Sequence, residues 1–300
     1  MKKLLSVTIG IPMYNEAQNI ESLLSSILLQ RRDIWQLDKI ILYADGCTDD
    51  TVKIISRINN NKVFLINSTK RNGQAFGQNK IIKNTTSNVL VLLNADIKLE
   101  GQNFISNLVR PFLTDPRMGM TSANVIPLES NNFFEKVINW SHQIKKSIYN
   151  SSVDLEIYLC HGRARALSKQ FYHNLVFQKL IAEDAYSYLR CKELDLNFSY
   201  CKDAILHFRS PSNLKEYLLQ SRRYFKGAQE LGKYFKNKSL NNIYQIKVSY
   251  LLKYWTSSLL QRPILTMVYI LVAFYSSFTY KIQDTQISYI WEPSNSSKKL

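Results

Sequence analysis

The chain has 300 residues, 45% hydrophobic and 12% aromatic, so it can bury a large core, and disorder is excluded as its main state. Lys and Arg number 39 against 23 Asp and Glu, a formal net charge of +16. This charge predicts a face that attracts phosphates, whether of a nucleotide, a nucleic acid or an anionic membrane. The four cysteines show no CxxC or zinc-type spacing, which argues against a disulfide framework and favours a reducing compartment.

Short apolar runs alternate with helix-like stretches in the first half of the chain. We expect strands at residues 4–11, 39–44, 62–67 and 88–94. The lysine-led start is assigned to the first strand and not to a signal peptide, because Ser6, Thr8 and Gly10 interrupt its apolar run. The alternation predicts an α/β fold with a mainly parallel sheet flanked by helices, which binds ligands at the carboxyl ends of its strands.

The pattern is less regular beyond residue 100. Helices are expected near residues 104–114, 132–149, 168–190 and 213–236, and strands at 118–126, 157–160 and 198–206. No linker-like stretch interrupts this region, so we expect residues 1–240 to form one globular domain.

The last 60 residues have a different character. Seven apolar residues are expected on one face of a helix, namely Ile243, Ile246, Leu251, Leu252, Trp255, Leu259 and Leu260. Residues 264–280 then form an uncharged stretch of 17, at the lower limit of about 17 for spanning a bilayer. Region 241–300 is therefore either a membrane-associated helical appendage or a set of helices packed on the domain.

Three polar motifs follow expected strands. They are Pro12-Met13-Tyr14-Asn15-Glu16, Ala44-Asp45-Gly46-Cys47-Thr48-Asp49-Asp50-Thr51 and Asn94-Ala95-Asp96. Together, and in this order, they resemble the motifs of the family 2 glycosyltransferases, inverting enzymes of the GT-A fold, over residues 5 to about 235. This sequence departs from the family pattern at Ala44 and Asn94, each of which stands where the family has Asp, and at Gln74, where it often has Lys.

The resemblance implies that residues 1–100 bind a nucleotide-diphosphate sugar and residues 101–240 bind the acceptor. Donor contacts are expected from Pro12, Tyr14, Asn15, Glu16, Asp45, Arg71, Gly73, Asn94 and Asp96. Asp96, helped by His207, is expected to hold Mn²⁺ or Mg²⁺, which prefer oxygen ligands and complete their shell with diphosphate oxygens.

The same resemblance assigns the catalytic and acceptor residues. Asp184 of the Glu183-Asp184 pair is expected to be the general base. Gln220, Arg223 and Tyr224 match the Q-x-x-R-W motif of polysaccharide synthases, with Tyr in place of Trp, and their spacing places them on one helix face. His161 and Gly162 are expected in the acceptor pocket.

We therefore expect a metal-dependent inverting glycosyltransferase that uses a UDP-sugar and a saccharide or lipid-linked acceptor. We expect it on the cytoplasmic face of an anionic membrane. The alternative is a non-catalytic sugar-nucleotide-binding protein of the same fold, because the departures at Ala44, Gln74, Asn94 and Tyr224 are also those of a decayed site. Nucleic acid is not expected as a partner, because the chain has no RNP-like motif, GxxG loop or zinc knuckle.

Overall fold

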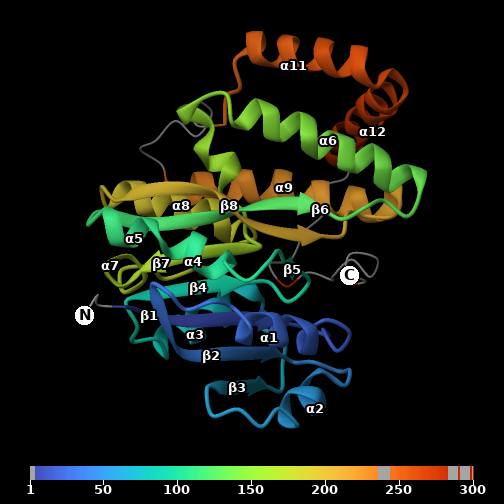
Figure 1. Ribbon diagram of the computed structural model, residues 1–300. Coiled ribbons are helices and arrows are strands. Elements are labelled where there is room, and N and C mark those ends of the chain that lie inside the picture. Colours follow the sequence, from blue (N-terminus) through green and yellow to red (C-terminus); the bar gives the residue numbers. More distant parts are fainter. Residues whose placement is uncertain (1–3, 236–243, 283–289, 291–297, 299) are drawn as a thin grey trace.

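The protein is described by a computed structural model that covers residues 4–235, 244–282, 290, 298 and 300. At its centre is an eight-stranded sheet of order β3-β2-β1-β4-β7-β6-β8-β5 (Figure 1). The four strands expected in the first half are β1 (Leu5–Met13), β2 (Trp35–Asp45), β3 (Val63–Ser68) and β4 (Val89–Leu93). Their pairings with one another are all parallel, as the alternation with helices predicts.

The second half of the sheet is mixed. It contains β5 (Lys98–Leu99), β6 (Met118–Pro127), β7 (Ala164–Ser168) and β8 (Asn197–Phe208). β7 lies antiparallel between β4 and β6, whereas β6 pairs in parallel with β8. The short β5 is antiparallel to β8 at the sheet edge.

The strand expected at residues 157–160 is wrong. Residues Val153–Leu159 form a 3₁₀ helix, η1, whose preceding residue Ser152 accepts a hydrogen bond from the Asp154 amide at 3.3 Å. The strand in this region is β7, whose sequence Ala-Arg-Ala-Leu-Ser contains Arg165, a residue with no exposed surface. A buried arginine and two alanines give no apolar alternation, so the sequence pattern did not reveal the strand.

Burial on both faces explains the apolar strands. In β4, Val89, Val91 and Leu93 pack with helices on one face of the sheet, while Leu90 and Leu92 pack on the other. The first face carries α1 (Ile20–Leu28), α2 (Thr51–Ser56) and α4 (Phe104–Val109). The second carries α3 (Gln74–Lys83), α7 (Lys169–Tyr172) and α8 (Glu183–Glu193).

Two expected helices are each divided in two. Residues 104–114 form α4 and α5 (Pro111–Thr114), and residues 168–190 contain α7 and α8 with a non-helical segment between them. Helices α6 (Phe133–Tyr149) and α9 (Leu214–Tyr234) match their expected ranges closely. Both begin with an asparagine whose side chain accepts an amide hydrogen bond: Asn132 from Glu135 and Asn213 from Glu216.

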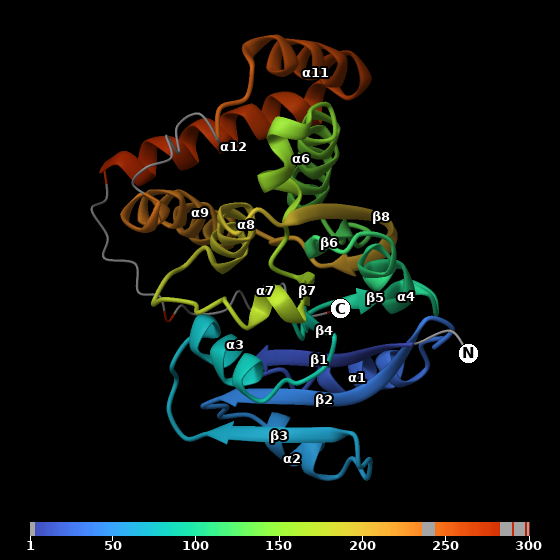
Figure 2. The ribbon, with the colours of Figure 1, turned by 90° about the vertical axis from the view of Figure 1, so that its left-hand side faces the viewer.

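The C-terminal helices form a separate layer with α6. Figures 1 and 2 show α11 (Val248–Gln261) and α12 (Pro263–Ile282) beside α6, above the sheet. Leu265 and Tyr269 are buried in a third apolar cluster with α6, and Trp140 donates its indole hydrogen to Thr266 at 2.9 Å. The inner face of α12 is therefore a packing face.

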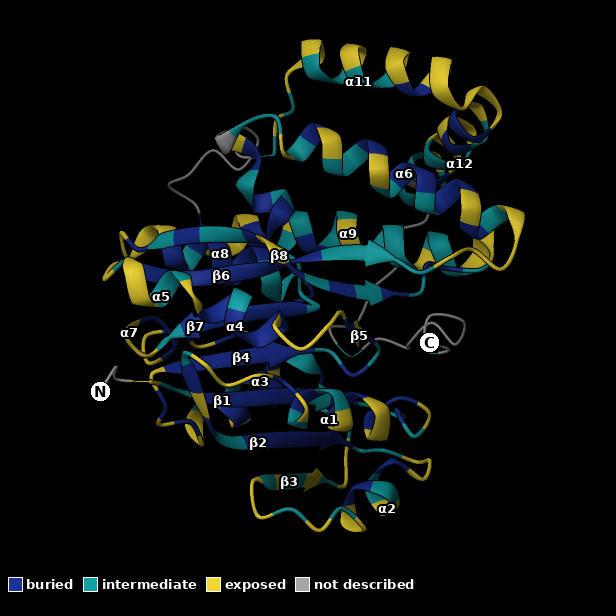
Figure 3. Ribbon diagram, viewed as in Figure 1, coloured by how far each residue is buried: buried dark blue, intermediate teal, exposed yellow. Residues whose placement is uncertain are grey.

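The outer face of the same layer is apolar and exposed. On α12 it consists of Ile264, Met267, Leu271, Phe274 and Phe278, each between 53% and 71% exposed and hereafter called the outer stripe. Much of α11 is likewise exposed (Figure 3). Among the described residues, Pro263–Tyr280 is long and apolar enough to cross a bilayer, and 28% of that window is buried.

The amphipathic face expected over residues 243–260 is not continuous. Ile246, Leu251 and Trp255 pack toward α6, whereas Leu252, Leu259 and Leu260 are exposed. Helix α11 begins only at Val248, so the helical phase does not extend back to Ile246. Ile243 lies outside the described residues.

Candidate functional site

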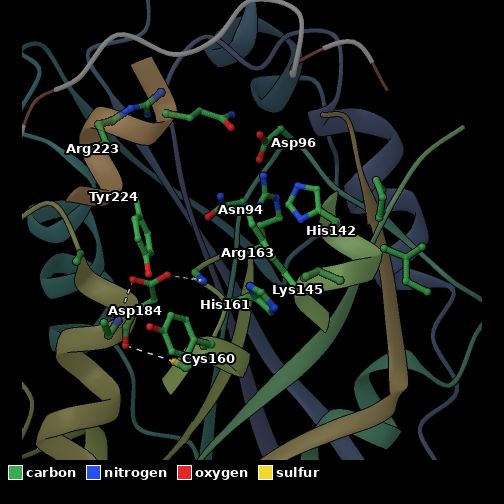
Figure 4. Close-up of a pocket in the computed structure, with 18 of the residues that line it drawn as sticks. Asn94, Asp96, His142, Lys145, Cys160, His161, Arg163, Asp184, Arg223 and Tyr224 are labelled. Carbon is green, nitrogen blue, oxygen red and sulfur yellow. Dashed lines mark hydrogen bonds between the residues drawn. The ribbon is translucent and has the colours of Figure 1, made fainter. Parts of the chain in front are cut away.

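A cavity of about 1160 Å³ collects most of the residues expected in the site. It extends from the carboxyl ends of β1, β2 and β4 to α6, α8 and α9 (Figure 4). Of the expected residues, its walls include Pro12, Tyr14, Glu16, Asp45, Arg71, Gly73, Asn94, Asp96, His161, Gly162, Glu183, Asp184, Gln220, Arg223 and Tyr224. Asn15 and His207 are not among the lining residues.

The loop after β1 brings a buried carboxyl group into the cavity. Glu16 is 7% exposed. Its carboxylate accepts a hydrogen bond from the Asn19 side chain at 2.9 Å and forms a salt bridge with Lys298 at 2.9 Å. Burial, with the negative charge of Asp96 second, raises the pKa of Glu16 to about 7. Glu16 therefore changes charge near neutral pH, and the ion pair with Lys298 opposes that shift.

Asn15 supports this loop from outside the cavity. Its φ of 53° is in the left-handed region, which asparagine tolerates better than most residues. Its side chain accepts from the Thr48 amide at 2.8 Å and donates to the Thr48 hydroxyl at 3.0 Å. Asn15 thus ties the loop after β1 to the loop after β2, and its expected contact with the donor stays a prediction.

Asp45 ends β2 and holds the next loop in place. Its Oδ1 accepts from the Asn72 amide at 2.7 Å and its Oδ2 from the Gly73 amide at 2.9 Å. Gly73 has a φ of 90°, which a residue with a side chain rarely adopts. A carboxylate offers about four acceptor positions, so Asp45 keeps acceptor capacity for a ligand group.

Arg71 lies over the ring of Tyr14, with its guanidinium carbon 3.7 Å from the ring centroid. This cation–π contact places a fixed positive charge next to Glu16 and Asp45 on the donor side of the cavity. Nothing in the resemblance had given Arg71 a partner.

The motif after β4 presents two oxygen-bearing side chains to the cavity. The side-chain oxygen of Asn94 accepts a hydrogen bond from Gln74 at 3.2 Å, and the backbone amide of Asn94 donates to the Arg163 carbonyl at 2.9 Å. Asp96 lines the cavity within electrostatic range of Glu16. Two neighbouring carboxyl groups and an amide oxygen are the ligand chemistry that Mn²⁺ and Mg²⁺ select, so these residues fit a divalent cation.

His207 does not join this set. Its Nε2 lies 2.7 Å from the Glu100 carboxylate, and the two residues are held at the sheet edge by the pairing of β5 with β8. No cluster of three or more His, Cys, Asp or Glu suited to a metal occurs within the described part of the chain. The register of β8 pairs His207 with Lys98, two residues from Asp96, and its side chain contacts Glu100, so the expected metal role of His207 stays a prediction.

The acidic pair opens α8 on the opposite side of the cavity. Asp184 Oδ2 accepts from the Gly162 amide at 3.1 Å, and Oδ1 accepts from the Ala185 amide at 2.8 Å. Burial, followed by the charge of Asp184, raises the pKa of Glu183 to about 7. Two backbone amides thus fix the orientation of the Asp184 carboxylate, while burial and the charge of Asp184 favour the protonated form of Glu183.

A buried arginine positions this pair. Arg165 on β7 has no exposed surface and donates to the Glu183 carbonyl at 2.9 Å, to the Ser187 hydroxyl at 2.8 Å and to Gln78 at 3.2 Å. It joins β7, α3 and the first turn of α8, so the acidic residues are held rigidly against the sheet.

Helix α9 supplies three further lining residues. Gln220, Arg223 and Tyr224 all face the cavity, as their spacing predicts. Burial lowers the pKa of Arg223 to about 10, partly offset by Glu183, and the guanidinium stays charged at neutral pH. Figure 4 shows Arg223 and Tyr224 on the side of the cavity from which Asp184 also projects.

Several lining residues were not anticipated from the sequence. Arg163 lies between Asp96 and His142 in Figure 4, with its guanidinium carbon 3.9 Å from the Phe208 ring centroid. An aromatic wall is formed by Tyr149, Tyr158 and Tyr244, of which the first two stack at 4.4 Å. The signal for Arg163 was available, since it directly follows His161-Gly162; the tyrosines are scattered along the chain and show no motif.

Comparison with known proteins connects this geometry to described families. The protein-family model described as "Glycosyl transferase family 2" matches residues 8–176 of this sequence. The O-antigen chain rhamnosyltransferase of Salmonella typhimurium is 25% identical over 211 residues, or 67% of this chain and 66% of that protein. The poly-beta-1,6-N-acetyl-D-glucosamine synthase of Staphylococcus aureus is 29% identical over 119 residues, or 39% of this chain and 28% of the synthase.

Solved structures show the same fold. A mannosyltransferase from Pyrobaculum calidifontis, in complex with GDP-Man and Mn²⁺, matches 93% of this chain and 79% of its own with a TM-score of 0.62 and 16% identity. Glucosyl-3-phosphoglycerate synthase from Mycobacterium tuberculosis, in complex with Mn²⁺, UDP and glucosyl-3-phosphoglycerate, matches 76% of this chain and 79% of its own with a TM-score of 0.53 and 17% identity. The α/β architecture with a central mixed sheet is therefore the GT-A fold.

Proposed function

This chain belongs to glycosyl transferase family 2, and from that premise we propose that it is a metal-dependent inverting glycosyltransferase. The donor in this proposal is a UDP-sugar, and the acceptor is a saccharide or a lipid-linked saccharide. The observation that carries it is that Asp96, after β4, and Asp184, at the start of α8, line one cavity. A site for the leaving group and a base for the acceptor thus face the same space.

Asp184 acts as the general base in this proposal. Inverting transfer needs one base that takes the proton of the acceptor hydroxyl while that oxygen attacks C1 opposite the departing diphosphate. The amides of Gly162 and Ala185 hold the Asp184 carboxylate in one orientation. Glu183, whose pKa is about 7, is a poorer base below neutral pH.

A divalent cation is proposed on the donor side. Asp96 would hold it, with the Asn94 oxygen beside it and Glu16 within electrostatic range. When bound, Mn²⁺ or Mg²⁺ neutralises charge on the leaving diphosphate. The two structural neighbours are complexes with Mn²⁺ and GDP-Man or UDP, which supports a cation on the donor side.

The remaining roles are assigned by position. Arg223 and Gln220 would face the diphosphate, and Arg71 and Asp45 would face the nucleoside. Tyr224, with Tyr149 and Tyr158, offers aromatic surface for an acceptor sugar. Because Tyr224 is smaller than the Trp of processive synthases, we propose the transfer of one or a few sugars.

Residues 1–240 form the catalytic domain in this proposal, with donor and acceptor halves meeting near residue 100. The outer stripe and the exposed apolar residues of α11 would contact an anionic membrane on its cytoplasmic face. The chain spans 66% of the rhamnosyltransferase and 28% of the synthase. The proposed membrane contact therefore refers to α11 and α12 of this chain and not to the relatives.

Release of nucleoside diphosphate from a panel of nucleotide sugars with Mn²⁺ tests the proposal. One donor should be hydrolysed slowly without acceptor and faster with it. A protein that binds a donor and leaves it intact would support the alternative of a non-catalytic binding protein.

A further inference from the structure

One wall of the cavity carries positive charge that neither the donor nor the base uses. Helix α6 contributes His142, Lys145 and Lys146, and Arg163 and Arg262 lie beside it. We call these five residues the α6 wall. Carboxylates line the other sides of the cavity, at Asp96 and at the Glu183-Asp184 pair.

Three cations of the α6 wall contact aromatic rings and form no salt bridge in the described part of the chain, although Asp96 and Asp184 act electrostatically on Arg163. Lys145 lies 5.3 Å from the centroid of Tyr269, Arg163 lies over Phe208, and Arg262 lies 5.4 Å from the centroid of Trp140. The salt bridges found within 4 Å among the described residues include none of the three. The Arg163 Nε is also buried without a hydrogen-bond partner.

The pKa values of two histidines and one lysine in this part of the cavity are lowered. Burial, followed by Lys145 and Arg163, lowers the pKa of His142, and burial, followed by Arg163 and Lys146, lowers that of His161 to about 3. Burial also lowers the pKa of Lys145. Lys145 is partly buried, faces an aromatic ring and forms no salt bridge in the described part of the chain. A cation in that position is costly to keep without an anion, which indicates that a ligand anion completes the site.

Most of the α6 wall lies on other elements than the donor residues, and Arg163, whose carbonyl accepts from the Asn94 backbone amide, borders both. The donor residues follow β1, β2 and β4, whereas α6 packs on η1, β6 and the C-terminal helices. Arg163 directly follows Gly162, the residue whose amide orients Asp184. An anion on this wall therefore lies on the side where the acceptor hydroxyl must meet its base.

We propose that the α6 wall is a phosphate subsite and that the acceptor carries a phosphate group close to the hydroxyl that receives the sugar. This inference rests on the proposed function, because it specifies the acceptor of the same site. Phosphate supplies the double negative charge and the several oxygens that two or three converging cations bind.

Two sources of such a phosphate are distinguished by experiment. Arg262 stands immediately before α12, whose outer stripe begins at Ile264. A lipid phosphate would place its headgroup at Arg262 and its chain along that stripe. A soluble sugar phosphate would use the wall without the stripe.

Isothermal titration calorimetry tests the subsite with inorganic phosphate and with glycerol 3-phosphate. The donor side is first filled with the matching nucleoside diphosphate and Mg²⁺. We expect saturable binding to the wild-type protein and a loss of about tenfold or more for Lys145→Gln, since a hydrogen bond to a charged group is worth roughly 1.5–3 kcal/mol. Lys253→Gln removes the same charge from the exposed face of α11, outside the cavity, and should leave the affinity within about twofold.

A second arm uses vesicles of phosphatidylcholine with and without phosphatidic acid. A lipid source predicts that Lys145→Gln weakens binding to the phosphatidic acid vesicles more than Lys253→Gln does. A soluble source predicts that only phosphate and glycerol 3-phosphate distinguish the two variants. Equal behaviour of both variants in both arms would overturn the subsite.

Two further measurements keep the test independent of folding and of the proposed function. Lys145→Met keeps the length of the side chain and removes a buried charge, so its Tm should equal or exceed that of the wild type while phosphate binding is lost. If the wild-type protein hydrolyses a nucleotide sugar but binds no phosphate, the phosphate subsite is contradicted and the proposed function is not. Wild-type protein that binds phosphate but hydrolyses no nucleotide sugar would remove the proposed function.

Discussion

The backbone amide of Gly162 donates a 3.1 Å hydrogen bond to Asp184 Oδ2, and a Cβ at residue 162 would lie 3.4 Å from that oxygen. The loop before β7 and the first turn of α8, 22 residues apart, thus meet at the carboxylate that we propose as base. Contact at this distance is of the ordinary van der Waals kind, so residue 162 borders the carboxylate directly.

Asp184→Asn should lower turnover by about 10²- to 10⁴-fold, the usual contribution of a general base. Donor affinity should change little, because the carboxylate acts on the acceptor. Steady-state kinetics and titration with the nucleoside diphosphate measure the two effects. Normal turnover in this variant would transfer the role of base to Glu183 or another carboxylate.

Asp96→Asn should abolish metal-stimulated donor binding and reproduce the effect of EDTA on the wild type. The physical reason is the loss of the charged oxygen ligand on the donor side. Calorimetric titration with the nucleoside diphosphate, with and without Mn²⁺, measures it. Asp195→Asn is the control, since that side chain is 97% exposed. Full activity of the wild type in chelated buffer would contradict the metal assignment.

Arg223→Ala should lower kcat more than it raises the KM for the donor, because a cation facing the departing diphosphate stabilises charge that develops in the transition state. The neighbouring Arg222 borders a different, smaller hollow and is absent from the cavity lining. Arg222→Ala should therefore leave kcat nearly unchanged. If Arg223→Ala changed only the KM, Arg223 would bind the ground state and the transition state equally well.

Glu16 should make stability depend on pH near neutrality. Its pKa is raised from 4.5 to about 7 in the folded state, so the folded protein binds more protons than the unfolded chain between these values. Stability from this group is complete below about pH 4.5 and is lost as pH rises through 7. Glu16→Gln should flatten the fall of Tm between pH 5 and pH 8. The free energy of unfolding that Glu16 loses over this range is at most about 3 kcal/mol. An unchanged slope would show that Glu16 is ionised throughout.

The double substitution Leu271→Glu and Phe274→Glu should reduce binding to anionic vesicles while Tm stays close to that of the wild type. Both side chains are exposed, at 67% and 71%, so the change removes apolar contact surface and leaves the packing on α6 intact. Leu29→Glu, at an equally exposed leucine directly after α1, is the control in vesicle flotation. Equal flotation of all three proteins would argue against a membrane role for the outer stripe.

Local pattern determined much of the fold in advance. The apolar runs at β1 to β4 indicated parallel strands because residues buried on both faces of a sheet leave no polar alternation. The motifs ending in Glu16, Asp45 and Asp96 indicated the site because parallel strands bring their carboxyl ends to one edge. In these cases neighbours in sequence carried the information.

Long-range register decided the rest. His207 follows the family pattern in sequence, but only the pairing of β5 with β8 sets it opposite Lys98, where its side chain contacts Glu100. The buried Arg165 gave no strand signal, although its bonds to Glu183 and Gln78 hold the acidic pair. The α6 wall joins residues as far apart as Lys145 and Arg262, and no local pattern relates their charges. The sequence by itself therefore determined the first four strands and the residues at their ends, while only the tertiary structure decided which charges share a cavity, because that depends on packing between distant elements.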